Sequence, residues 1–188
     1  MGDLRPAIVM LMLFTVICGG IYPALVTAIA QALFPHQARG SFITGKGGRN
    51  VGSSLIGQPF TAPDYFRPRP SATANGPYNP AGSGGSNAGP TNPAFIATVG
   101  ERVEDLRSGG LSGPIPADLV LASASGLDPH ITPDGARVQV PRVARARHLP
   151  EEAVRTIVAA HTEDRQLGFL GAPRVNVLRL NLALDSLK

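Results

Sequence analysis

The sequence predicts a single N-terminal transmembrane helix followed by one soluble α+β (irregular α/β) domain. Three observations support this class: an uncharged apolar stretch over residues 7–34, a Gly- and Pro-rich stretch over residues 57–93, and mixed helical and strand-like apolar spacings elsewhere. Helices and strands mix without a regular βαβ repeat, which is why we expect an α+β or irregular α/β domain. We expect three parts: a short tail at residues 1–6, the membrane helix at 7–34 and the soluble domain at 35–188.

The membrane helix is predicted from length and composition. No side chain in residues 7–34 is charged. A helix of this length spans about 42 Å, against about 30 Å for the hydrocarbon core of a bilayer, so it can cross with room for tilt. Gly19 and Gly20 remove side chains at mid-depth, and Pro23 has no N–H to donate. We expect a bend near residues 19–23 and close packing of this face on other helices.

The same stretch has features of a secretory signal peptide. Arg5 precedes the apolar run, and Ala28-Ile29-Ala30 matches an A-x-A cleavage site. Cleavage would leave an exported soluble binding protein. The apolar character continues through Phe34, beyond the proposed cut and further than a signal core needs, so the membrane helix is the favoured interpretation.

The charges beside the helix do not fix its orientation. Arg39, Lys46 and Arg49 follow it closely, and by the positive-inside rule they would keep the domain in the cytoplasm. Long domains, however, translocate largely regardless of charge.

Composition disfavours two other classes. The net charge is +4, but the arginines are dispersed and the chain has no Trp, so we do not expect nucleic-acid binding. Cys18 is the single cysteine, which excludes an intrachain disulfide and a cysteine-based zinc cluster.

Apolar spacing and turn residues predict the elements of the soluble domain. In residues 57–93, 14 of 37 residues are Gly or Pro, so we expect an irregular but ordered loop, pinned by aromatic side chains. Spacings of three and four predict helices, and short apolar or alternating runs predict strands. The expected anchors are Phe60, Tyr65, Phe66 and Tyr78; the expected helices span residues 93–107, 141–147 and 150–161; the expected strands span residues 41–43, 54–56, 119–122 and 174–184.

No catalytic motif stands out. The Ser83-Gly84-Gly85 run lacks the lysine and the strand-to-helix context of a phosphate-binding loop, so a turn is favoured. Asp128 with His130, and His161 with Glu163, place a carboxylate near an imidazole, but two isolated pairs favour structural roles over a metal site. A membrane-anchored hydrolase would need Ser, His and Asp to converge in one pocket, and no spacing indicates that they do.

Short sequence blocks from the apolar helix nearly to the C terminus form a specific set when taken together. The blocks are YP at 22–23, VTAIAQ at 26–31, IGQ at 56–58, YFR at 65–67, RPSA at 69–72, SGGSN at 83–87, ASASGLDPHI at 122–131, QVPRVA at 139–144, NV at 176–177 and LNLAL at 180–184. In their identity and order they resemble the C subunit of the bacterial Kdp-type potassium-transporting ATPase.

The resemblance implies an accessory subunit without a catalytic site of its own, held in the bacterial inner membrane by one helix. The implied partners are a channel-like potassium-binding subunit, a P-type ATPase catalytic subunit, a small single-helix subunit and membrane lipid. On this basis Gly19, Gly20 and Pro23 are where we expect close packing on neighbouring helices.

The resemblance also implies a catalytic chaperone that raises the ATP affinity of the pumping subunit. Gln139 and the loop of Ser83, Gly84, Gly85, Ser86 and Asn87 match positions suggested to touch nucleotide. We expect no firmly bound cofactor and no metal, with ATP relevant only in the complex. A rival view places the soluble domain outside the cytoplasm, over the potassium entrance, and we favour this periplasmic location.

Overall fold

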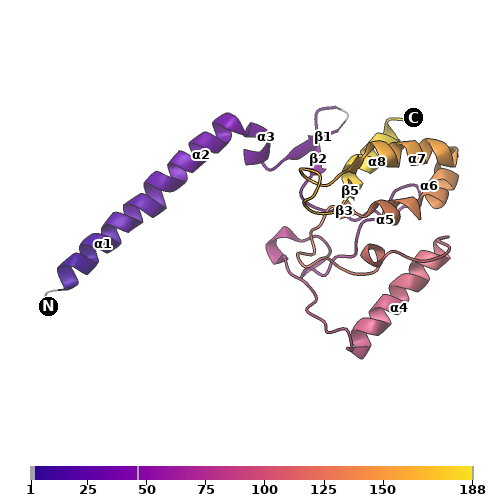
Figure 1. Ribbon diagram of the computed structural model, residues 1–188, viewed down its shortest axis with the longest axis horizontal. Coiled ribbons are helices and arrows are strands. Elements are labelled where there is room, and N and C mark those ends of the chain that lie inside the picture. Colours follow the sequence, from indigo (N-terminus) through magenta and orange to yellow (C-terminus); the bar gives the residue numbers. More distant parts are fainter. Residues whose placement is uncertain (1–2, 46, 188) are drawn as a thin grey trace. The chain divides into compact units, whose positions relative to one another are not determined.

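The computed structural model describes residues 3–45 and 47–187. Residues 1 and 2 of the expected tail, Lys46 and the last residue of the expected domain lie outside these ranges. The chain divides into an N-terminal unit that ends at Phe42 and a C-terminal unit that begins at Ile43. The predicted class, one apolar helix followed by a mixed helix and sheet domain, is confirmed (Figure 1).

One long helical rod forms most of the N-terminal unit. It consists of α1 (Leu4–Val16), a π-helical turn η1 (Ile17–Ile21) and α2 (Tyr22–Leu33). Its 30 residues have a mean hydropathy of 2.2 over the most apolar window, and none of that window is buried within the structure. The rod is therefore long and apolar enough to cross a membrane.

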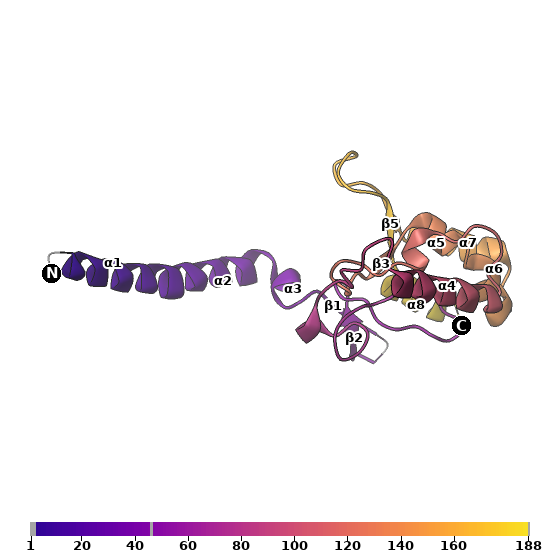
Figure 2. The same cartoon turned by 90° about the horizontal axis from the view of Figure 1, so that it is seen from below.

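Where the sequence predicts a bend, near residues 19–23, the helix contains the π-turn. The N–H of Tyr22 donates to the carbonyl of Ile17, five residues earlier. Pro23 follows at once and has no N–H for the carbonyl of Gly19, so the ladder is interrupted where the π-turn lies. The ribbon continues through this turn in Figures 1 and 2, so the helix is widened locally and not broken.

A short helix, α3 (Pro35–Ala38), follows the rod, and then β1 (Phe42–Thr44) and β2 (Asn50–Ser53) form a two-stranded sheet. The first strand lies one residue from its predicted place, but the strand predicted at residues 54–56 is wrong. The Ser53 hydroxyl accepts the N–H of Leu55 at 3.1 Å, which makes a local turn in place of a ladder.

Residues 57–93 contain one 3₁₀ turn, η2 (Pro80–Gly82), and are otherwise irregular. Phe66 and Tyr78 are buried, and the rings of Phe60 and Tyr65 lie 5.5 Å apart between centroids. Aromatic side chains among these four anchor the irregular segment to the rest of the C-terminal unit.

Helix α4 (Pro93–Ser108) begins where the sequence predicts. The Asn92 side chain accepts the N–H of Ala94 at 2.9 Å and thereby caps the helix. The predicted strand at residues 119–122 is wrong. A 3₁₀ turn, η3 (Ala117–Leu119), lies there instead and buries Leu119, whose N–H donates to the carbonyl of Pro116.

The turn-rich stretch before residue 135 contains elements that the sequence did not reveal. They are β3 (His130–Ile131) and α5 (Pro133–Arg137), and the Thr132 hydroxyl caps α5 by accepting the N–H of Gly135. Helices α6 (Val140–Arg147) and α7 (Glu151–Ala160) lie within one residue of their predicted bounds.

The strand predicted at residues 174–184 is wrong beyond its first three residues. Strand β5 (Arg174–Asn176) is followed directly by helix α8 (Val177–Asp185), and the Asn176 side chain caps that helix by accepting the N–H of Arg179. In the sequence, Val175 and Val177 alternate with polar neighbours, and the leucines from Leu178 onward take the opposite phase. This change of phase marks the switch from strand to helix.

A small antiparallel sheet has the order β3-β5-β4, with β4 formed by Thr162–Glu163. Figure 1 shows α5, α6, α7 and α8 grouped around it, with α4 set apart from this group. The core includes buried side chains from the sheet, from α6, α7 and α8, and from the irregular segment: Phe66, Ile131, Val140, Val143, Val154, Val175, Leu180 and Leu184.

Candidate functional site

The predicted loop of Ser83, Gly84, Gly85, Ser86 and Asn87 packs on a turn near residue 125. The Ser83 hydroxyl and the Gly84 N–H both donate to the Ser125 carbonyl at 3.0 Å. Gly85 lies close to the backbone of residue 124, where an added Cβ would come within 3.1 Å of its carbonyl oxygen. The loop is therefore held mainly through backbone groups.

Gln139, the other predicted residue, is fully buried just before α6. Its Oε1 accepts from the Arg67 N–H and from the Arg142 guanidinium, both at 2.8 Å. Its Nε2 donates to the carbonyls of Arg67 at 3.1 Å and Gly135 at 3.0 Å. The amide group thus makes four hydrogen bonds within the chain, which is its full capacity.

Gln139 and the loop at residues 83–87 are not brought together by hydrogen bonds. The loop is held by Ser125, whereas Gln139 pairs with Arg67, Gly135 and Arg142. The two parts share none of these partners.

Gln139 belongs instead to a group of side chains that holds residues 63–67 of the irregular segment. Asn181 of α8 bonds to both backbone groups of Phe66, just as Gln139 bonds to those of Arg67. Its Oδ1 accepts the Phe66 N–H at 2.9 Å, and its Nδ2 donates to the Phe66 carbonyl at 3.0 Å. Two side-chain amides therefore satisfy the N–H and C=O groups of two consecutive residues, which backbone groups on either side would do within a sheet.

Two arginines of α6 hold the preceding residues. Arg142 donates to the carbonyls of Pro63 at 2.6 Å and Tyr65 at 2.9 Å, and Arg147 donates to that of Asp64 at 2.6 Å. Burial lowers the pKa of Arg142 to about 10, which leaves its guanidinium charged at neutral pH. We call Gln139, Arg142, Arg147 and Asn181 the polar clamp.

The segment then ties the clamp to the rest of the unit. Arg67 pairs with Asp105 of α4 at 2.7 Å, and Arg69 pairs with Asp128 at 3.0 Å. The Tyr78 hydroxyl donates to the Arg69 carbonyl, and burial raises the pKa of this phenol.

The two His–carboxylate pairs lie in structural contacts. Asp128 accepts from the His130 N–H at 3.0 Å, and the Nδ1 of that histidine lies 3.3 Å from the carboxylate. The Nδ1 of His161 lies 2.9 Å from the Ile157 carbonyl, while Glu163 pairs with arginines. Among residues 3–45 and 47–187, no cluster of three or more His, Cys, Asp or Glu side chains is arranged to hold a metal ion.

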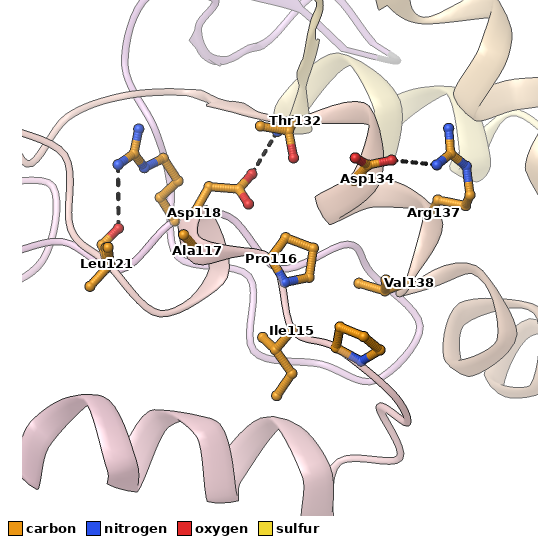
Figure 3. A pocket seen from close by; sticks show the side chains of 11 residues that line it. Ile115, Pro116, Ala117, Asp118, Leu121, Thr132, Asp134, Arg137 and Val138 are labelled. Carbon is orange, nitrogen blue, oxygen red and sulfur yellow. Dashed lines mark hydrogen bonds and ion pairs between the residues drawn. The ribbon is translucent and has the colours of Figure 1, made fainter.

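The largest hollow described in the C-terminal unit has a volume of about 750 Å³ (Figure 3). Figure 3 shows Asp118, Asp134 and Arg137 on one side and Ile115 and Val138 on the other. Asp134 and Arg137 pair with each other, and Asp118 accepts the Thr132 N–H at 2.6 Å. Neither Gln139 nor the loop at residues 83–87 lines this hollow.

The predicted helix-packing residues lie on an open surface of the rod. An added Cβ at Gly19 or Gly20 would meet no atom of the described residues within 4 Å, apart from the helix's own backbone, and Pro23 follows in the first turn of α2. This part of the helix therefore offers room for another helix to approach.

Sequence reasoning missed Arg142, Arg147 and Asn181. The available signal was a polar residue within an apolar run: Asn181 lies among leucines in α8, on the face that also buries Leu180 and Leu184. A buried amide needs partners, but the sequence does not say that they lie more than one hundred residues away.

The clamp predicts a large difference between two substitutions on α8. Asn181→Leu removes both bonds to Phe66 and leaves a buried N–H and C=O unpaired, so it should lower the free energy of unfolding by about 3 kcal/mol. Arg179→Leu, on the exposed side of the same helix, should cost about 1 kcal/mol or less. Urea unfolding followed by circular dichroism measures both, and equal losses would contradict the clamp.

Acid should release the contacts of Asp128. Burial alone would raise the pKa of this carboxyl, but hydrogen bonds from His130 and the charge of Arg69 hold it below its usual range. The stabilisation is therefore fully present above the unfolded pKa of about 4 and is lost as pH falls through the lower folded value.

Asp128→Asn should accordingly destabilise the chain by about 1–3 kcal/mol at neutral pH, and this difference should shrink below about pH 4. Asp134→Asn, which breaks an exposed ion pair, serves as the control and should change stability little. Urea unfolding at several pH values gives the result, and a deficit independent of pH would refute the assignment.

Comparison with known proteins covers the whole length of the chain. A family model described as KdpC, K+-transporting ATPase, c chain, matches residues 4–186. A potassium-transporting ATPase KdpC subunit of Geobacter sulfurreducens is 68% identical over 187 residues, covering 100% of this chain and 99% of the relative.

More distant relatives carry the same description. The subunit of Geobacter metallireducens is 64% identical over 187 residues, covering 100% of this chain and 99% of the relative. That of Burkholderia vietnamiensis is 58% identical over 185 residues, covering 97% of this chain and 95% of the relative. The chain therefore belongs to the KdpC family, the C chain of K+-transporting ATPases.

Proposed function

We propose that the chain is an accessory subunit of a high-affinity, ATP-driven potassium uptake complex in the bacterial inner membrane. The single observation that carries this proposal is the family match, which includes the apolar rod as well as the C-terminal unit. The partners are a channel-like potassium-binding subunit, a P-type ATPase catalytic subunit, a small single-helix subunit and the surrounding lipid. The subunit stabilises this assembly and supports transport.

The alternative of an exported protein released by signal cleavage is not supported. Relatives match this chain over its full length, with the apolar rod as part of the shared sequence. The rod is 30 residues long, which suits a membrane span better than the short core of a signal peptide.

We further propose that the C-terminal unit acts in the periplasm without catalysing a reaction itself. The described hollow of about 750 Å³ supports this view, because Arg69 and Arg137 at its edge are paired with Asp128 and Asp134. These carboxylates compete with any phosphate group for the two guanidinium groups. The structural contacts around His130 and His161 likewise favour a positioning role for these side chains.

An effect on ATP affinity then acts through the complex. ATP is cytosolic, so a periplasmic unit would act as a catalytic chaperone by favouring one state of the pumping subunit across the membrane. The contacts of Gln139 favour an indirect role for this residue. Its amide is buried and makes all its hydrogen bonds with Arg67, Gly135 and Arg142, so it stabilises the C-terminal unit. The loop at residues 83–87 likewise stabilises the unit, because Ser83 donates a hydrogen bond to the Ser125 carbonyl.

Gln139→Ala tests whether this amide touches nucleotide. If it acts only within the clamp, the variant should lose about 2–3 kcal/mol of stability and the assembled complex should keep its apparent ATP affinity. Asn181→Leu is the matched control, because it opens the same clamp from α8 and has no suggested nucleotide contact. ATP titration of hydrolysis by both purified complexes decides: a large loss of ATP affinity confined to Gln139→Ala, with normal assembly, would contradict the proposal.

Gly20→Leu tests the packing of the membrane helix. Because, outside the helix's own backbone, no atom of residues 3–45 and 47–187 lies within 4 Å of an added Cβ, the substitution should leave the C-terminal unit intact. It should nevertheless reduce recovery of the partner subunits about tenfold, since a large side chain prevents close helix approach. Val9→Leu, at another exposed position of α1, is the control. Affinity purification in mild detergent measures the recovery, and unchanged recovery for Gly20→Leu would exclude packing at this residue.

A further inference from the structure

The loop between β4 and β5 exposes a cluster of apolar side chains. Figure 2 shows this hairpin projecting from the rest of the C-terminal unit. At its tip Leu167 is 82% exposed, Phe169 69% and Leu170 48%. Other strongly exposed large apolar side chains of the unit, such as Leu55 and Ile96, are isolated in sequence. A cluster of this kind on a soluble surface is typical of an interaction site.

The tip is also held in one conformation. Gln166 and Leu170 form a bridge in which each N–H donates to the other's carbonyl at 2.9 Å. The backbone φ is +53° at Leu167 and +82° at Gly168, so both residues adopt the left-handed conformation. This conformation is unfavourable for leucine, which has a bulky side chain. Such local strain is typical of functional positions.

The base of the hairpin adds to this order. Glu163 of β4 lies opposite Arg174 of β5 in the sheet, and their side chains pair at 3.0 Å. Arg179 of α8 also approaches Glu163, at 3.6 Å. A hairpin fixed at both base and tip loses little conformational freedom when it binds, which favours affinity.

Charge indicates what the tip contacts. Residues 166–173 carry no charge, so the surface that receives them needs no opposite charge at its centre. An anionic lipid surface would be matched by a cluster of cations, whereas Arg165 at the base of the tip is adjacent to Asp164. The membrane helix, moreover, already fixes the chain to lipid far more strongly than three side chains can.

We propose that the hairpin tip, residues 166–170, inserts into an uncharged apolar pocket on another subunit of the same potassium-transporting ATPase. This inference rests on the proposed role as an accessory subunit and adds its contact surface. Phe169 and Leu167 act as the anchors, because rigid, large apolar side chains in a desolvated pocket provide most of the binding energy at protein interfaces.

Photo-crosslinking in the intact complex tests the contact. Phe169 is replaced by p-benzoylphenylalanine in the full chain, the complex is irradiated in native membranes, and adducts are identified by mass spectrometry. The expected product joins this chain to one of the other subunits through an apolar residue. An adduct with lipid alone, with a second copy of this chain, or no adduct at all would overturn the proposal.

Substitution measures the strength of the contact. The triple variant Leu167→Ser, Phe169→Ser and Leu170→Ser should dissociate from the purified complex about tenfold faster than the unaltered chain, with unchanged thermal unfolding of the chain because these side chains are exposed. The control, Leu55→Ser with Ile96→Ser, removes exposed apolar groups elsewhere and should dissociate at the unaltered rate.

The outcomes separate two failures. If the unaltered chain does not purify with the other subunits, the accessory-subunit function fails. If it does, and the triple variant dissociates no faster than the control, the function stands and the hairpin contact is refuted.

Discussion

The C-terminal unit depends on pairing the backbone of residues 63–67, where the irregular segment inserts Phe66 into the core. Peptide groups that become buried in this way cannot be left unpaired, because each buried, unsatisfied group costs about 1–3 kcal/mol. The usual solution is a neighbouring strand, but the sheet here consists of three very short strands. Gln139 and Asn181 replace the missing neighbour, and Arg142 and Arg147 extend the same pairing to the preceding carbonyls.

This arrangement explains why conspicuous polar residues of the unit have structural roles. The clamp joins α6 and α8 to residues 63–67, and Arg67 continues the connection to α4 through Asp105. Elements far apart in the sequence therefore share one network of hydrogen bonds and ion pairs. A substitution in one of these elements should alter the stability of the others. An accessory subunit that stabilises a complex benefits from such a unit, because a rigid body presents its contact surfaces with little loss of conformational entropy.

The sequence predicts those parts of this fold that depend on local patterns. The long apolar helix, α4, α6 and α7 follow from composition, caps and helical spacing, and all are present. Residues 54–56, 119–122 and 177–184 differ from their predicted state because short apolar runs fit a strand, a turn or a helix equally well until their partners are known. The clamp was missed for a related reason: Asn181 pairs with a residue 115 positions away, and no local pattern encodes that distance.

Native-state hydrogen exchange at the amides of Phe66 and Arg67 is the most direct test of the clamp. Both N–H groups donate to buried side-chain amides, so they should exchange as slowly as Val143 in the buried part of α6, although they belong to no helix or strand. Amides of the exposed turn at residues 74–76 should exchange quickly in the same sample. If Phe66 and Arg67 exchange as fast as that turn, the segment is not held by the clamp and the account of this unit is wrong.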